Sequence, residues 1–184
     1  MSGGAGAPAP WPWLLTYLAV LAFQRASELR LSARHTAALR ARGAIEHGAA
    51  LYPWIVALHV AWPLALIAEV AGAGARPFAW WPAALVALLA ASALRIASMR
   101  ALGELWTTRV LVLPDHPRVT RGVYRWLAHP AYAGVALELL AAPLLFGAWR
   151  TAIAASIVHA TLLTLRVRDE ERALTPPGPA LPHA

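Results

Sequence analysis

A polar group of side chains directly precedes an apolar run in the last third of the chain. His129 and Pro130 come just before the run, and Tyr132 follows within it. Since proline is favoured at the first position of a helix, we expect a helix to begin here with His129 at its N-cap. The free N–H groups at such a start suit an anion such as a carboxylate or a phosphate. The alternative is that His129 only caps the helix and that Tyr132 only lies at a membrane interface.

A second polar group follows the last apolar run of the chain. It contains Arg166, Asp169, Glu170 and Glu171. A helix C-terminus disfavours anions, so three consecutive acids there break a local rule, as functional sites often do. Arg166 and Glu170 are four residues apart, which places them on one helix face and able to pair. The alternative is a solvated, self-neutralising charge cluster that contributes little.

Four ionisable residues lie inside the apolar runs, where a charge is costly and marks a candidate functional site. We expect Glu69, near the end of its run, to reach water. Glu138 would line a polar cavity or bind a backbone group of a neighbouring helix. His59 would face the same cavity, although a buried, hydrogen-bonded histidine is the favoured interpretation; His159 is the fourth.

The elements that must position these side chains are strongly apolar. Of the 184 residues 59% are hydrophobic and only 14% are charged, with a mean hydropathy of +0.53. A soluble domain carries about 25% charged residues, so a soluble enzyme is excluded. Because a span needs roughly 20 residues, the sequence predicts an all-α integral membrane protein with about five transmembrane helices. The predicted spans are residues 11–31, 52–71, 80–98, 131–148 and 151–165.

The charges predict an orientation rather than a nucleic-acid partner. The net charge is +7, and all 16 basic residues are arginines that punctuate the apolar runs. With the N-terminus outside and the C-terminus inside, fourteen arginines fall on the inner side, as the positive-inside rule requires, and only Arg76 and Arg150 fall outside. The inner arginines are Arg25, Arg30, Arg34, Arg40, Arg42, Arg95, Arg100, Arg109, Arg118, Arg121, Arg125, Arg166, Arg168 and Arg172.

Several kinds of chemistry are excluded or not indicated. The chain has no cysteine, which excludes disulfides, thiolate zinc sites, iron–sulfur clusters and a cysteine nucleophile. The histidines lack metal-ligand spacing, so we expect no metal. Sequence motifs of serine hydrolases, P-loops, dinucleotide-binding folds and zinc proteases are absent.

We expect one domain over residues 1–174, with a cofactor-binding part at about 100–174 and a disordered, proline-rich tail at 175–184. The cytoplasmic loop 100–129, between the third and fourth helices, contains a β-like run at 108–113. The arginine-rich segment 32–50 would hold an amphipathic stretch on the inner leaflet, with a helical restart near Ile45.

The two polar groups together resemble the isoprenylcysteine carboxyl methyltransferase family. The similar pattern is Gly122-x-Tyr124, His129-Pro130-x-Tyr132-x-Gly134, a helical hairpin, and Arg166-x-x-x-Glu170-Glu171, over about the C-terminal 80 residues. Upstream segments at 28–34, 42–46, 52–54 and 106–110 resemble a small bacterial branch of that family. Its members are often encoded beside type III polyketide synthases and are taken to methylate alkylpyrone or alkylresorcinol lipids.

The resemblance implies an S-adenosylmethionine-dependent O-methyltransferase of the cytoplasmic (inner) membrane, with its active site facing the cytoplasm and without a Rossmann fold. Its partners would be the lipid bilayer, a hydrophobic small-molecule acceptor and, functionally, a type III polyketide synthase. Arg166 and Glu170 would be catalytic, with Arg166 orienting the acceptor oxygen. Candidates for the substrate pocket are Glu138, His59 and Trp106. The implied cofactor site comprises Tyr124, His129, Pro130, Tyr132, Glu170 and Glu171.

Two positions depart from the family pattern, and other functions stay open. Ala128 stands where the family usually has arginine, and Val123 where proline is common. A carboxylate or an acidic enol is already an anion near neutral pH, whereas a phenol with a pKa of about 10 would need a base, so an acidic acceptor is favoured. The alternatives are an NADPH-dependent membrane reductase related to sterol reductases and a non-catalytic membrane scaffold.

Overall fold

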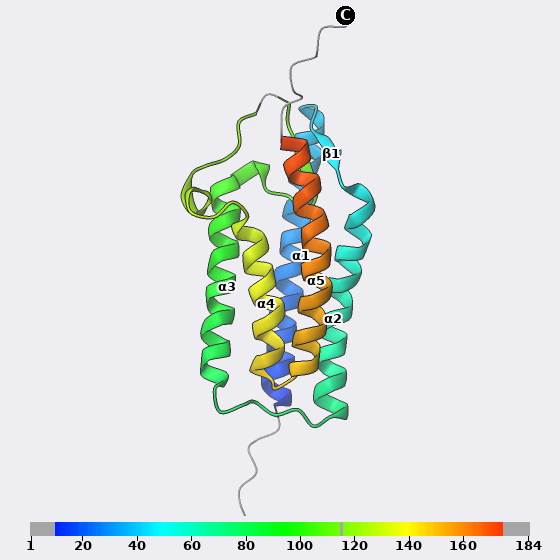
Figure 1. Cartoon of the computed structure of the whole chain (residues 1–184), viewed down its shortest axis with the longest axis vertical. Helices are drawn as coiled ribbons and strands as arrows, with labels where there is room; N and C mark the ends of the chain where they lie inside the picture. Colours follow the sequence, from blue (N-terminus) through cyan, green and yellow to red (C-terminus); the bar gives the residue numbers. More distant parts are fainter. Residues whose placement is uncertain (1–9, 115, 175–184) are drawn as a thin grey trace, which may run out of the picture.

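Five long helices run side by side along the long axis of the molecule (Figure 1). The computed structural model describes residues 10–114 and 116–174; the predicted tail at 175–184 lies outside them. The all-α prediction is confirmed. The helices are α1 (Trp11–Ala41), α2 (Tyr52–Gly72), α3 (Trp81–Leu102), α4 (Pro130–Leu145) and α5 (Trp149–Leu174).

Helices α1 and α5 are longer than their apolar runs. Helix α1 continues from residue 31 to Ala41, because residues 32–41 are rich in alanine and arginine and contain neither glycine nor proline. Gly43, with φ +87°, then ends the helical path. Helix α5 carries the second polar group on its last turns, so both polar groups of the sequence lie on helices.

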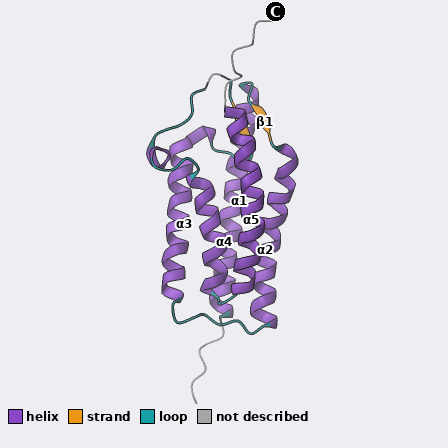
Figure 2. Cartoon of the chain, viewed as in Figure 1, coloured by secondary structure: helices purple, strands orange, loops and turns teal. Residues whose placement is uncertain are grey.

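A small sheet marks one end of the bundle, which we call the sheet end (Figure 2). Strand β1 (Ile45–His47) pairs antiparallel with β2 (Val110–Val112), and Ile45 faces Val112. The β-like run is therefore confirmed at its centre. The predicted helical restart near Ile45 is wrong, because this segment finds a strand partner more than 60 residues away. Short 3₁₀ turns η1 (Ala49–Leu51), η2 (Gly103–Leu105) and η3 (Gly122–Arg125) complete this end.

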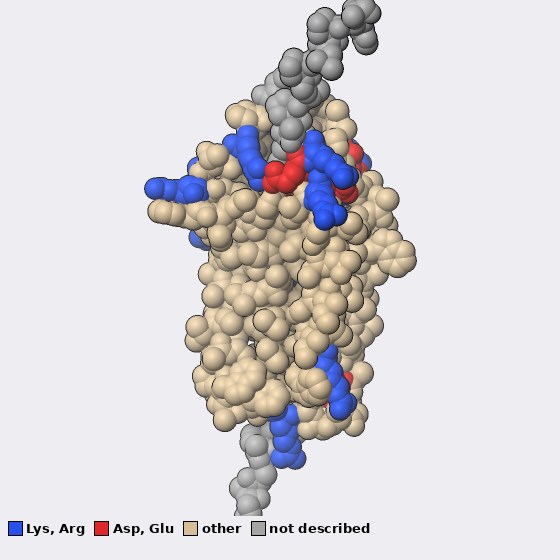
Figure 3. All heavy atoms as spheres, viewed as in Figure 1, with Lys and Arg blue, Asp and Glu red and all other residues tan. Residues whose placement is uncertain are grey.

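Two segments within the described residues are long and apolar enough to cross a bilayer, namely Ala49–Gly72 and Trp81–Leu105. Helix α4 is apolar but has only 16 residues. In the view of Figure 3 the charged side chains gather toward the two ends, and uncharged residues cover the middle. A membrane protein fits this surface, while the five spans and their orientation stay a prediction.

Helices α3 and α4 pack closely because Gly134 lies between them. A Cβ atom at this position would lie 2.7 Å from Cγ of Arg95 and 3.1 Å from the carbonyl oxygen of Ala91. The contact brings Arg95 to the side of α4. The glycine of the sequence motif is thus explained by helix packing.

Glu69 connects α2 to the start of α5. Its carboxylate accepts hydrogen bonds from the backbone N–H groups of Arg150 (3.1 Å) and Thr151 (2.7 Å). An anion at a helix N-terminus is stabilised by the free N–H groups and the helix dipole. Glu69 is only partly buried, which is consistent with the expected contact with water, and its carboxylate also caps the first turn of another helix.

Candidate functional site

Both polar groups of the sequence come together at the sheet end, around a cavity of about 180 Å³ that we call the loop cavity. Its wall includes the segment between β2 and η3, together with the first turn of α4 and the last turns of α5. Pro130 is buried as the first residue of α4. The expected site residues in the wall are Trp106, Tyr124, His129, Tyr132, Arg166 and Glu170.

The hydroxyl of Tyr132 joins the two polar groups. It donates a hydrogen bond to the Glu170 carboxylate and accepts one from Nε of Arg166 at 2.9 Å. Arg166 also donates from Nη2 to the backbone carbonyl of Thr108 at 2.8 Å. No ion pair between Arg166 and Glu170 is among those that the described residues form. The two side chains share a helix face as predicted, but they meet through the tyrosine.

His129 is the N-cap residue of α4, as predicted, and its side chain contacts the end of α5. Its ring makes no side-chain capping bond; Nε2 lies 2.9 Å from Oε1 of Glu171, and the ring stacks on Tyr132 at a centroid distance of 5.5 Å. Glu171 also accepts a hydrogen bond from Arg118. The bonds from Arg118 and His129 hold the pKa of Glu171 below its usual range. The acids at the end of α5 are therefore held by donors from α4 and the loop.

Tyr124 presents a second hydroxyl to the loop cavity. Burial raises the pKa of Tyr124 to about 12, and the nearby Glu170 carboxylate adds to the rise. The phenol therefore stays protonated at neutral pH, as a hydrogen-bond donor. Tyr124 lies on η3, six residues before the start of α4.

A second, largely apolar cavity of about 280 Å³ lies between the helices, and we call it the interhelix cavity. Tyr52, His59 and Leu162 are among its lining residues. It shares wall residues with the loop cavity, so the same side chains separate the two spaces. The shared residues are Trp106, Thr107, Ala131, Tyr132 and Arg166.

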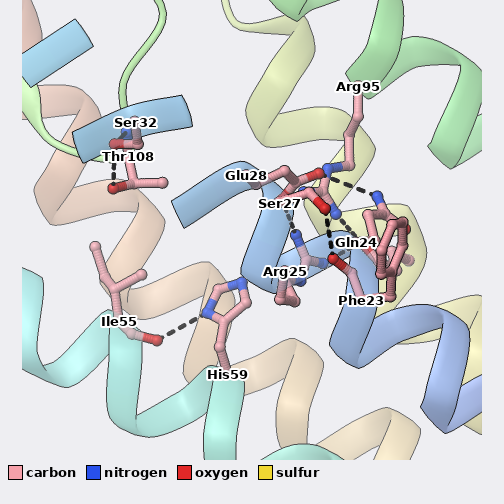
Figure 4. Close-up of polar contacts among 11 residues, drawn as sticks. Phe23, Gln24, Arg25, Ser27, Glu28, Ser32, Ile55, His59, Arg95 and Thr108 are labelled. Carbon is pink, nitrogen blue, oxygen red and sulfur yellow. Dashed lines mark hydrogen bonds and ion pairs between the residues drawn. The ribbon is translucent and has the colours of Figure 1, made fainter. Parts of the chain in front are cut away.

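Four charged residues form a buried ion cluster beside the interhelix cavity; three of them, Arg25, Glu28 and Arg95, are labelled in Figure 4. Arg25 binds Glu28 at 2.9 Å and Glu138 at 2.6 Å, and Arg95 binds Glu138 at 2.5 Å and also pairs with Glu28. Two positive and two negative charges balance, which lowers the cost of burying them.

Glu138 takes a different place from the substrate-pocket position we expected. The interhelix cavity is lined by Arg25, Glu28 and Arg95, while Glu138 is 4% exposed and contacts both arginines. A lone carboxylate in an apolar bundle would be costly, so pairing determines its position. His59 and Trp106, by contrast, lie in the cavity wall as predicted.

The sequence pattern does not predict that Arg25, Glu28 and Arg95 form a group. It places the two arginines among the charges that set the membrane orientation. Arg95 lies within the predicted third apolar run, and Arg25 and Glu28 lie three apart at the end of the first. Because a charge within a membrane is costly, the position of these residues inside apolar runs is the signal that could have predicted their pairing. Thr108 was also missed; its hydroxyl contacts Ser32 (2.9 Å) and Tyr52 (3.1 Å).

The part of the chain that the structure describes contains no group of three or more histidine, cysteine or acidic residues that could hold a metal ion. The polar side-chain groups that line the loop cavity are hydroxyl, imidazole, guanidinium and carboxylate groups. They suit a polar organic ligand that carries charges of both signs.

Comparisons with known proteins agree with this arrangement. Residues 84–176 match the model of the isoprenylcysteine carboxyl methyltransferase family. An uncharacterized protein of Bacillus subtilis (strain 168), YpbQ, is 39% identical over 162 residues, which cover 88% of this chain and 95% of that protein. An uncharacterized protein of Haemophilus influenzae is 28% identical over 88% of this chain and 94% of its own length. No solved structure matches the chain. The matched residues contain both polar groups and the two cavities' shared wall at α4 and α5, and the chain belongs to the isoprenylcysteine carboxyl methyltransferase family.

Proposed function

We propose that this chain is an S-adenosylmethionine-dependent O-methyltransferase that acts on a lipidic acceptor at the inner face of the cytoplasmic membrane. Family membership supports a methyltransferase in general. The observation that carries the finer proposal is the shared wall of Tyr132 and Arg166 between a polar cavity and an apolar one. A methyl transfer needs its two reactants on opposite sides of one point, because the displacement is in line.

The residues of the loop cavity fit this cofactor. Glu170, half-buried, offers a carboxylate to an ammonium group or a ribose hydroxyl, and Tyr124 offers a protonated hydroxyl. His129 and Arg118 supply donors for a carboxylate, and aliphatic side chains such as Leu105 provide apolar wall for the adenine ring. When bound, the cofactor supplies an electrophilic methyl group.

Arg166 is the residue we assign to the acceptor. Its Nε and Nη2 are held by Tyr132 and Thr108, while its Nη1 makes no hydrogen bond with the described residues. A fixed guanidinium with one nitrogen available can hold an acceptor oxygen at the shared wall. The apolar interhelix cavity would take the hydrocarbon part of the acceptor and exclude water from the reacting atoms.

An acidic acceptor needs no further group from the protein. A carboxylate or the enol of a hydroxypyrone, such as a polyketide synthase product, would already be ionised, and Arg166 would orient it. A phenol would need a base, and the Glu170 carboxylate at the loop cavity is already engaged by Tyr132. The structure therefore favours an acidic enol or carboxylate as the methylated group.

The orientation rests on the arginines and the tryptophans. With Arg25 and Arg95 in the buried ion cluster, twelve of the fourteen arginines remain as topology signals, against Arg76 and Arg150. Five exposed tryptophans lie near the predicted outer ends of the spans, where they fit an interfacial aromatic belt. They are Trp11, Trp13, Trp80, Trp81 and Trp149. We place the sheet end in the cytoplasm, where the cofactor is made.

Cofactor binding by the full chain in nanodiscs tests the proposal. Calorimetric titration with S-adenosylhomocysteine should give saturable binding, while NADPH should give none. Glu170→Gln should weaken binding about tenfold, as expected for the loss of one charged hydrogen bond. The adjacent Asp169→Asn, which does not line the loop cavity, is the matched control. Binding of NADPH alone would indicate a reductase. If neither ligand binds, the result would indicate a non-catalytic scaffold.

A further inference from the structure

The interhelix cavity has polar side chains at both of its ends, and the proposed function involves the polar side chains at only one of these ends. Arg166 and Tyr52 lie toward the sheet end. On α2, His59 follows Tyr52 by seven residues, and on α5 His159 precedes Arg166 by seven residues. At 1.5 Å per residue, both histidines lie about 10 Å further along the bundle. Both line the cavity, from two helices that pack on each other.

His159 is 8% exposed as a residue, and no hydrogen bond of its ring is among those that the described residues form. Its ring nitrogens are not among the fully enclosed polar atoms without a partner, which are Tyr17 Oη and Ser156 Oγ, so they border the open space of the cavity that His159 lines. Buried polar groups are nearly always bonded to protein, to ordered water or to a ligand. A cavity-facing imidazole of this kind therefore points to a group that occupies the cavity beside it.

The bonding of His59 limits what that group can be. Its Nδ1 lies 2.8 Å from the backbone carbonyl oxygen of Ile55 (Figure 4). A carbonyl oxygen only accepts, so Nδ1 carries the hydrogen and Nε2 of the neutral ring is an acceptor. The occupant must donate a hydrogen bond to this nitrogen.

We propose that His59 and His159 form a subsite for a hydroxyl group on the hydrocarbon chain of the acceptor, about 10 Å from the oxygen that is methylated. A hydroxyl has one hydrogen, so it donates to Nε2 of His59 and accepts from the protonated ring nitrogen of His159. A carboxylate only accepts, so it cannot donate to Nε2 of His59, and an unmodified alkyl chain leaves both rings unbonded. The inference rests on the proposed function, because the other end of the same ligand is the methyl acceptor.

The test uses three probes with the full chain in nanodiscs: hexadecanoic acid, its mid-chain hydroxylated derivative and its terminally hydroxylated derivative. Dissociation constants are measured by displacement of radiolabelled hexadecanoic acid. We expect the mid-chain derivative to bind about three- to tenfold more tightly than the other two, which corresponds to one net hydrogen bond.

Two variants on different helices check where the preference arises. His159→Leu and His59→Leu should each abolish the preference for the mid-chain derivative over hexadecanoic acid. Thr161→Val is the matched control, because Thr161 is exposed, lies on α5 outside the cavity wall and bonds only within its own helix. It should keep the preference.

Equal affinities for the three probes, a preference that survives in both leucine variants, or no binding of any probe would overturn the subsite; water would then satisfy the histidines. Methylation of the probes with radiolabelled S-adenosylmethionine is measured separately. A preference without methylation or cofactor binding contradicts the proposed function alone. Methylation without a preference contradicts the subsite alone.

Discussion

At the scale of single residues, Tyr132 determines how Arg166 and Glu170 are placed. One hydroxyl accepts from the guanidinium and donates to the carboxylate, so neither charged group moves independently of the other. Hydrogen bonds to charged groups contribute about 1.5–3 kcal/mol each. His129 stacks on the tyrosine ring and keeps it in place. We therefore regard Tyr132 as the residue that relates the cofactor side of the site to the acceptor side.

Tyr132→Phe keeps the ring and removes only this hydroxyl. We expect methyl transfer to fall about 10- to 100-fold, because a displacement of Arg166 by about 1 Å misaligns the acceptor. Steady-state kinetics with a carboxylate acceptor measure the change. Tyr52→Phe, which removes a hydroxyl bonded to Thr108 instead, is the control and should have the smaller effect. An unchanged rate in Tyr132→Phe would show that the hydroxyl does not position the site.

At the scale of helices, the packing of α3 against α4 depends on the absence of a side chain at position 134. The approach of Ala91 and Arg95 to this glycine brings Arg95 within reach of Glu138 on the next turn of α4. The same helix begins at Pro130 and presents His129 and Tyr132 to the loop cavity. The separation of α3 and α4 thus affects both the buried ion cluster and the site.

Gly134→Ala should lower the free energy of unfolding by about 1–3 kcal/mol, because the new methyl group would overlap Arg95 and force the helices apart. Denaturant unfolding in detergent measures the loss. Gly72→Ala, where no atom lies within 4 Å of the added Cβ, should be close to neutral. Equal stability of the two variants would mean that the α3–α4 contact adjusts without cost.

At the scale of the whole molecule, the buried ion cluster holds α1 to α3 and α4. Glu28 and Arg25 come from α1, Arg95 from α3 and Glu138 from α4. Helices α2 and α3 are long and apolar enough to cross a membrane. Between membrane helices, hydrophobic burial favours no particular arrangement, whereas four charges that must pair with one another specify a single arrangement of the helices. The cluster also forms part of the wall of the interhelix cavity.

Glu138→Gln leaves a net positive charge in the cluster and should destabilise the protein by about 3–5 kcal/mol. Adding Arg25→Gln restores neutrality, so the double variant should be more stable than the sum of the two single losses predicts. Unfolding of the four proteins in one detergent gives the coupling free energy. Additive losses would show that these two residues do not interact as an ion pair.

The local features of this protein follow from its sequence alone. Apolar runs of helical length determine the five helices, Pro130 determines where α4 begins, and the spacing of Arg166 and Glu170 places them on one face of α5. The range that matches the methyltransferase family, residues 84–176, contains these motifs. Such features depend on neighbouring residues, which is why composition, periodicity and capping preferences suffice to predict them.

Only the tertiary structure decided which distant groups become partners. The Glu69 carboxylate caps α5, 81 residues away, Tyr132 separates Arg166 from Glu170, and β1 forms because β2 is available. By sequence position alone, Arg25 and Arg95 count among the charges that set the membrane orientation. In the structure they form ion pairs with Glu28 and Glu138. The ion pairs of the cluster exist because buried charges must be paired, and which partner pairs with each charge depends on helix packing, which no local pattern encodes.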